Sequence, residues 1–220
     1  DKIINFKNIK EKPFYSLSQK VTGESHKNKI NKIVNYLKEN KLDYIFITAP
    51  ENVAWVLNIR GNDNPTSPIP NSNLIISKNK EKFIISSKNK LIKLVKEKKI
   101  NVNEIIEPKN IKNLLKKLNG KNISLDPKSC SFNYEQVFSK KLKVIKKNDP
   151  IYLLKSIKNK IEIKKMIESH IADGVALTKF IYWIKNINKK KITEVDAQEK
   201  LEKFRKINKD YLYPSFNTIA

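Results

Sequence analysis

The possible folds of this chain are limited most by an alternation of helix-like and strand-like segments that runs from Ser25 to Ile145. Ser25 can cap a first helix, which is expected to end near Asn40. The buried face of this helix is predicted by four aliphatic residues at i, i+3, i+4 and i+7, namely Ile30, Ile33, Val34 and Leu37. Further strands are expected at 44–48, 74–77, 83–86, 102–106, 123–126 and 142–145, and further helices from Pro50 and at 91–97, 111–118 and 134–138. The strands at 74–77 and 83–86 are joined by a polar turn at 78–81 and predict a hairpin. This alternation predicts an α/β domain at residues 24–148, with helices packed on a mixed sheet.

The segments around these elements carry turn signals. Residues 1–23 contain Pro13 and Gly23 without a sustained period, so we expect an extended connector from a preceding domain. Residues 58–73 contain one glycine and three prolines and predict a structured loop.

The pattern changes near Pro150, after which residues 149–220 predict part of a second domain. A long helix from about residue 158 is expected to lie on a core through a stripe of Ile163, Ile167, His170, Gly174, Leu177, Ile181 and Ile184. A second helix is expected from Thr193, which has capping-box spacing to Asp196. Residues 215–220 resemble a strand. Two helices and one unpaired strand do not close a domain, so we interpret the sequence as cut from a longer chain.

The net charge of +24, from 46 basic and 22 acidic residues, raises the question of a nucleic-acid partner. Only Arg60 and Arg205 are arginines, and the lysines are spread through every segment. We interpret this as a composition bias and expect no nucleic-acid partner, although a dedicated basic surface remains an alternative.

The same sequence gives no sign of a membrane or an oxidising compartment. No run approaches the ~18 apolar residues of a membrane helix, and the N-terminus lacks the layout of a signal peptide. Cys130 is the single cysteine and can form no internal disulfide. We therefore expect a soluble cytoplasmic protein without a membrane partner.

Three segments, taken in order, resemble one family, the long three-domain form of the Xaa-Pro aminopeptidases (aminopeptidases P) of the creatinase group. Residues 47–63 read ITAPENVAWVLNIRGND and, with Asn64-Pro65 and residues 70–76, resemble the second domain of these enzymes. KSIKN at 155–159, Glu162-Ile163, Met166, His170, ADG at 172–174 and Ala176-Leu177 resemble the entry into their catalytic pita-bread domain. TEV at 193–195, EKFR at 202–205 and PSFNTI at 214–219 continue that domain in the same order.

The resemblance implies a creatinase N-terminal-like domain followed by the start of an incomplete α+β pita-bread domain. It also implies a dinuclear, commonly manganese-dependent peptidase that removes the first residue from peptides with proline in second position, by attack of a metal-activated hydroxide. In the family the metal ligands lie after the strand that ends here at Ile219, so no catalytic or metal-binding residue is carried over and the fragment is expected to bind no metal and to be inactive alone. Dimerisation of the full-length protein is implied as well.

The chain's own residues agree with that absence. His26 is expected to be solvated at the start of a helix, and His170 to be packed in a core. No histidine lies near Cys130 in sequence to activate its thiol.

Three residues are candidates for the rim of a substrate pocket. Arg60 stands in a loop with Asp63, which could be a turn held by an ion pair, or Arg60 and Trp55 could touch a peptide at the active-site mouth. Phe216 corresponds to a position where shorter relatives carry a tyrosine near the metals, so it can supply only apolar wall, or it is a plain core residue.

A second reading of the whole chain stays open. Creatinase-like domains also occur in non-catalytic proteins, so a peptide- or protein-binding module is the alternative to a peptidase.

Overall fold

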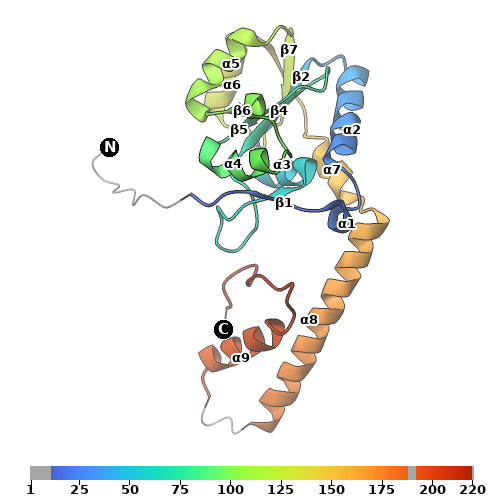
Figure 1. Cartoon of the computed structure of the whole chain (residues 1–220), viewed down its shortest axis with the longest axis vertical. Helices are drawn as coiled ribbons and strands as arrows, with labels where there is room; N and C mark the ends of the chain where they lie inside the picture. The colour runs from blue at the N-terminus through green and yellow to red at the C-terminus, as the bar shows by residue number, and fades with distance from the viewer. Residues whose placement is uncertain (1–10, 188–191, 220) are drawn as a thin grey trace, which may run out of the picture. The chain divides into compact units, whose positions relative to one another are not determined.

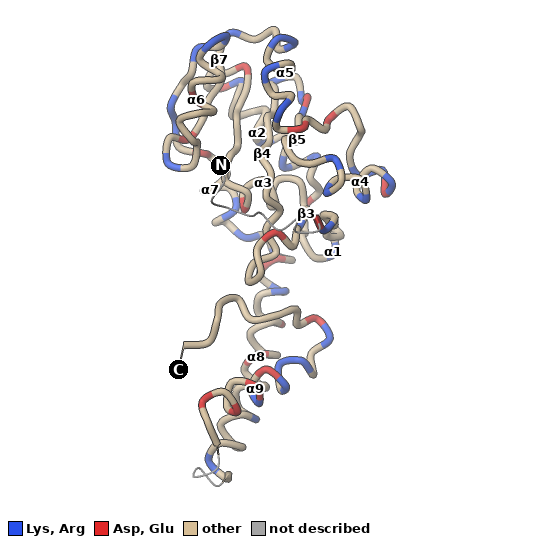
Figure 2. Tube along the Cα trace, turned by 90° about the vertical axis from the view of Figure 1, so that its left-hand side faces the viewer, with Lys and Arg blue, Asp and Glu red and all other residues tan. Residues whose placement is uncertain are grey.

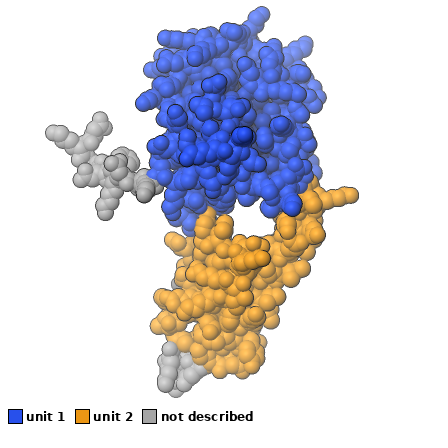
Figure 3. Space-filling view, in the orientation of Figure 1, with its two compact units in different colours: residues 1–157 blue, residues 158–220 orange. Residues whose placement is uncertain are grey.

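The computed structural model describes residues 11–187 and 192–219. Contacts between Cα atoms divide the chain into unit 1, residues 1–157, and unit 2, residues 158–220 (Figure 3).

Unit 1 is an α/β domain built on a mixed sheet flanked by helices (Figure 1). In chain order its elements are β1 (Tyr15–Ser16), α1 (Gln19–Thr22), α2 (His26–Glu39), β2 (Tyr44–Ile47), α3 (Pro50–Leu57), β3 (Ile59–Arg60), β4 (Asn73–Ser77), β5 (Lys82–Ile85), α4 (Lys88–Lys96), the 3₁₀ turn η1 (Val102–Glu104), β6 (Ile105–Ile106), the 3₁₀ turn η2 (Pro108–Asn110), α5 (Ile111–Lys117), β7 (Asn122–Leu125), α6 (Phe132–Ser139), β8 (Lys143–Lys146) and α7 (Ile151–Ser156).

The main sheet has the strand order β6-β5-β4-β2-β7-β8. Strand β2 pairs antiparallel with β4 and parallel with β7, and β7 pairs parallel with β8. Strands β4 and β5 form the predicted hairpin, in register from Asn73 opposite Ile85 to Ile76 opposite Lys82. The edge strand β8 has exposed Lys143 and Lys146 at its two ends.

Core residues pack on both faces of this sheet, as the burial of all four residues of β2 shows. Ile45 and Ile47 belong to the cluster formed with α2, α3 and α4, whereas Tyr44 and Phe46 belong to the cluster formed with α5 and α6. This alternation follows from the two-residue period of a strand. Phe46 lies 4.7 Å from Phe138, measured between ring centroids.

The first described residues belong to unit 1. Phe14 is fully buried in the cluster that contains α2 and α3, and its N–H donates to the Lys90 carbonyl at 2.8 Å. Strand β1 pairs antiparallel with β3, where Tyr15 lies opposite Arg60. The segment expected to be an extended connector therefore contains a strand and a helical turn, both too short to leave a period in the sequence.

Two other expectations for local structure were wrong in part. Residues 102–106 form a strand only at Ile105–Ile106, because the Asn101–Glu104 capping box turns the preceding residues into η1. No strand forms at 215–219, since none of the described residues pairs with this segment, and a strand needs a neighbour for its backbone hydrogen bonds.

Unit 2 contains α8 (Lys160–Asn186) and α9 (Glu194–Arg205). The predicted Thr193–Asp196 capping box is confirmed, and the Arg205 guanidinium binds the Asp173 carboxylate across the two helices at 2.6 and 3.3 Å. No helix among the described residues is long and apolar enough to span a bilayer.

The predicted buried stripe of α8 was wrong. Ile163, Ile167, Leu177 and Ile181 are 42–55% exposed, and His170 is also exposed. Among the described residues of α8, Ala176 alone is buried, and its partly buried neighbours at i+4 and i+7 are Phe180 and Trp183. A single helix, α9, covers only this sector, while the apolar residues of α8 spread over more of its circumference.

Candidate functional site

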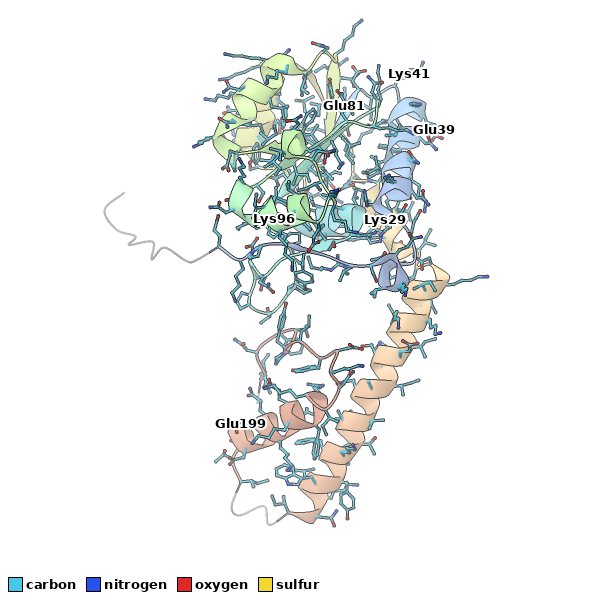
Figure 4. The ribbon with its side chains drawn as sticks, viewed as in Figure 1. Lys29, Glu39, Lys41, Glu81, Lys96 and Glu199 are labelled. Atoms are coloured by element: carbon cyan, nitrogen blue, oxygen red, sulfur yellow. The ribbon has the colours of Figure 1, made fainter. Side chains whose placement is uncertain are left out.

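Trp55 lies in the last turn of α3, next to a buried lysine. The ammonium of Lys29, which is labelled in Figure 4, sits 4.1 Å from the centroid of the Trp55 ring. It donates to the Trp55 carbonyl at 3.0 Å and to Asn58 Oδ1 at 2.8 Å. Lys29 is 1% exposed, so its hydrogen bonds and the ring face replace the water that the charge has lost. Asn58, which ends the helix with φ of 54°, holds the left-handed conformation that asparagine tolerates.

Arg60 supports the same helix end. Its Nη1 donates to the carbonyls of Ala54 at 3.1 Å and Ile59 at 2.8 Å. Lys29 and Arg60 therefore both donate hydrogen bonds to carbonyl groups in the last turn of α3. Positive charge at this end also interacts favourably with the helix dipole. Trp55 and the guanidinium of Arg60 therefore lie at the same end of α3.

The loop after Arg60 is held by an ion pair, between Asp63 and Lys90. The Lys90 ammonium lies 2.9 Å from Asp63 Oδ1, and Asp63 Oδ2 accepts a hydrogen bond from the Asn71 N–H at 2.7 Å. Gly61 is needed here because a Cβ would lie 2.8 Å from the Pro70 Cα.

Phe216 belongs to unit 2, in the segment after α9 that has no regular secondary structure. Its side chain is 66% exposed. The expectation of a core strand residue was wrong for this chain, because no described strand is present to bury it.

A second polar cluster, missed at the sequence level, lies where β7 and β8 end. The carboxylate of Asp149 accepts hydrogen bonds from Asn52 Nδ2 at 2.7 Å and from the Ile151 N–H at 2.9 Å. Lys155 donates to Asn52 Oδ1 at 2.6 Å, and the Asp149 N–H donates to Asp126 Oδ2 at 3.0 Å. Asn52 is fully buried, and its two hydrogen bonds link α3 to Asp149, just before α7, and to Lys155 within α7.

This cluster places a carboxylate in an unfavourable environment. Burial raises the pKa of Asp149, and the nearby Asp126 carboxylate raises it further, whereas the hydrogen bonds from Ile151 and Asn52 lower it. The sequence offered one signal, the change of character at Asn148-Asp149-Pro150, but nothing that paired it with Asn52.

Cys130 and His26 are the other titratable residues considered from the sequence. Burial raises the pKa of the Cys130 thiol to about 11, which keeps it protonated and unreactive. His26, expected to be solvated, is half-buried at the start of α2. Within residues 11–187 and 192–219, no three histidine, cysteine, aspartate or glutamate side chains converge on a point, so the described residues do not fit a dinuclear metal centre.

Comparison with models of protein families identifies the family of this fold. The family model for the Creatinase/Prolidase N-terminal domain matches residues 7–162, more than half of the chain. The chain belongs to this family. The creatinase/prolidase match covers α3, the loop around Arg60 and the Asn52–Asp149 cluster.

Two relatives of this creatinase/prolidase chain are named Xaa-Pro aminopeptidases. Xaa-Pro aminopeptidase 1 of Dictyostelium discoideum is 31% identical over 229 residues, which cover 98% of this chain and 36% of that protein. Xaa-Pro aminopeptidase ApepP of Drosophila melanogaster is 31% identical over 84% of this chain and 31% of its own length. The chain therefore spans about a third of the length of the curated relatives it matches.

Solved structures share the fold. The X-prolyl aminopeptidase of Caenorhabditis elegans, described as a cytosolic enzyme with a di-nuclear active site, superposes with a TM-score of 0.82 at 24% identity, over 98% of this chain and 36% of that one. A Bacillus anthracis Xaa-Pro dipeptidase superposes with a TM-score of 0.62 at 18% identity, over 83% of this chain and 49% of that one.

Proposed function

We propose that this chain is a supporting part of an Xaa-Pro aminopeptidase that removes the first residue from peptides with proline in second position. The observation that carries the proposal is the 31% identity to Dictyostelium Xaa-Pro aminopeptidase 1 over 98% of the chain, together with the family match. In this proposal residues 24–148 form the creatinase N-terminal-like domain, together with β1 and α7, which pack in unit 1. A preceding domain would join through residues 1–23, and the catalytic domain would begin within residues 149–220, after α7.

The complete enzyme is proposed to act through two divalent metal ions, with manganese the expected metal, in the cytoplasm and as a homodimer. The C. elegans structure, described as cytosolic and di-nuclear, supports the metal count and the compartment. No described residue is assigned to the metals, so the 220-residue chain is proposed to be inactive alone. The exposed aliphatic residues of α8 are proposed to pack against the rest of the catalytic domain.

The test uses the protein made from the complete gene. It is assayed on two peptides that differ only in having proline or alanine at position two, before and after chelation and readdition of manganese. We expect cleavage of the proline peptide alone, lost on chelation and restored by the metal. The 220-residue chain is the matched control and should release no product.

Other results would change the conclusion. Binding of the proline peptide without cleavage by the complete protein would favour the non-catalytic binding module. Hydrolysis by the 220-residue chain itself, after rigorous metal removal and readdition, would contradict its supporting role.

We also propose that Trp55, Arg60 and Phe216 contribute to the rim of the substrate pocket. Arg60→Ala in the complete enzyme should raise KM for longer peptides more than it changes kcat, and Arg60→Lys should restore part of the affinity because it keeps the charge. Unchanged kinetics of Arg60→Ala on longer peptides would remove Arg60 from the rim.

A further inference from the structure

Unit 1 contains a cavity of about 230 Å³ whose ionisable lining is basic. The lining comes from segments far apart in the sequence: β1, the start of α2, the end of α3, β5 and the residues after α4. Its titratable side chains are His26, Lys27, Lys82 and Lys99. No carboxylate is among the described residues that line it.

Positive charge in this cavity exceeds negative charge. Lys82 is neutralised by an ion pair with Glu104. Glu97 contacts the lining residue Ser16, whose Oγ donates a hydrogen bond of 3.4 Å to the Glu97 carboxylate. Within the part of the chain that the structure describes, neither Lys27 nor Lys99 is ion-paired, and both are exposed at the mouth. Two lysine charges therefore remain for a ligand, beside the imidazole of His26.

His26 responds to this environment. Burial lowers the pKa of its imidazole, and the charges of Lys82, Lys27 and Lys99 lower it further, while Glu104 raises it. The free imidazole is therefore largely neutral at neutral pH. An arriving anion would offset the lysine charges, so His26 would gain a proton as the anion binds.

We propose that this cavity binds a small phosphate group, contacted by Lys27, Lys99 and protonated His26. A phosphate carries about 1.5 to 2 negative charges at neutral pH and several acceptor oxygens, which matches a site that offers point charges from different directions. A carboxylate carries a single charge and two acceptor oxygens, so it would leave one of the two lysine charges unbalanced. The peptidase proposal does not assign this site.

The test follows the imidazole signals of the 220-residue chain by NMR, which is simple because the chain has two histidines. Inorganic phosphate is titrated at an ionic strength held constant with sodium chloride. We expect the His26 signals to shift and saturate, whereas those of His170, exposed on α8 in unit 2, stay unchanged. His26→Gln assigns the responding signals.

Charge variants locate the site. Lys27→Gln and Lys99→Gln should each weaken phosphate binding about tenfold, as expected for one charged hydrogen bond. Lys112→Gln removes the same charge from an exposed position on α5 and should leave the affinity unchanged. Both results together would tie binding to the cavity and separate it from the general positive charge, which Figure 2 shows spread over many elements.

Two further titrations define the ligand. Sulfate keeps a constant charge from about pH 5 to 8, so its affinity should rise as the pH falls and His26 takes up its proton. Competition by O-phospho-L-serine would show that a phosphate monoester is accepted, and failure to compete would restrict the site to the free ion.

The proposal is overturned if phosphate shifts the signals of both histidines linearly without saturation, which would indicate nonspecific association. Equal effects of Lys27→Gln, Lys99→Gln and Lys112→Gln on binding would overturn it as well.

Discussion

Replacing Asn52 with leucine probes the buried cluster that ties α3 to α7. Leucine has the same number of heavy atoms and the same branching as asparagine, so the change removes two hydrogen bonds without opening a cavity. One bond reaches Asp149, which is 7% exposed, and the other comes from the partly exposed Lys155.

The magnitude follows from these environments. A hydrogen bond to a charged group contributes about 1.5–3 kcal/mol, and a buried carboxylate that loses a donor has no water to replace it. Lys155 can turn to solvent, so its lost bond costs less. We expect Asn52→Leu to lower the free energy of unfolding of unit 1 by about 3 kcal/mol at neutral pH.

The pH dependence gives a second check. Because the pKa of Asp149 is raised in the folded protein, its contribution to stability is greatest below the ordinary carboxyl pKa and is lost as the pH rises through the raised value. The Asn52 bond lowers that pKa, so leucine raises it further. The destabilisation by Asn52→Leu should therefore be smaller, by about 1 kcal/mol, at pH ~4.5 than at pH ~7.5.

Urea unfolding monitored by tryptophan fluorescence measures both effects. Trp183→Phe leaves Trp55 as the reporter of unit 1, since the chain has two tryptophans. Asn113→Leu, at an exposed position of α5, is the matched control and should change the stability by less than about 0.5 kcal/mol. A loss below about 1 kcal/mol for Asn52→Leu, or the same loss at both pH values, would refute the reasoning.

Three further substitutions test packing by the same unfolding measurement or by thermal denaturation. Phe46→Ala should cost about 3–5 kcal/mol, because Phe46 is 1% exposed and packs on Phe138; a cost near that of a surface change would contradict this. Gly120→Ala should destabilise unit 1 by about 2 kcal/mol, since its Cβ would overlap the Tyr44 ring, and an unchanged midpoint would exclude that overlap. Gly174→Ala meets nothing within 4 Å inside α8 and should stabilise unit 2 by about 0.5–1 kcal/mol, so a loss of stability would show a hidden contact.

The sequence predicted what local patterns encode. The aliphatic face of α2 and its Ser25 cap were confirmed, because helical period and capping depend on neighbouring residues. The hairpin of β4 and β5 was confirmed for the same reason, and the resemblance around Trp55 led to the correct family.

Contacts between distant residues could not be predicted in this way. Asn52 and Asp149 are separated by 97 positions, and no period or spacing connects them. Phe14 enters the core from a segment without any pattern. The stripe of α8 was read correctly as apolar, but sequence alone does not say which sector another helix covers, so His170 was wrongly expected to be buried.

Positive charge on the edge strand β8 is expected to oppose association between copies of this chain. Strand β8 is the last strand on one side of the sheet, and no described residue pairs with its outer edge, which could accept a strand from a second copy. Lys146 is ion-paired with Glu135 at 2.7 Å, so such pairing would set mainly the exposed Lys143 of each copy against the same edge of the other, and the repulsion would be strongest in dilute buffer. Concentrated samples should therefore stay monodisperse at low ionic strength and begin to associate through this edge as salt is added, the reverse of an association driven by opposite charges.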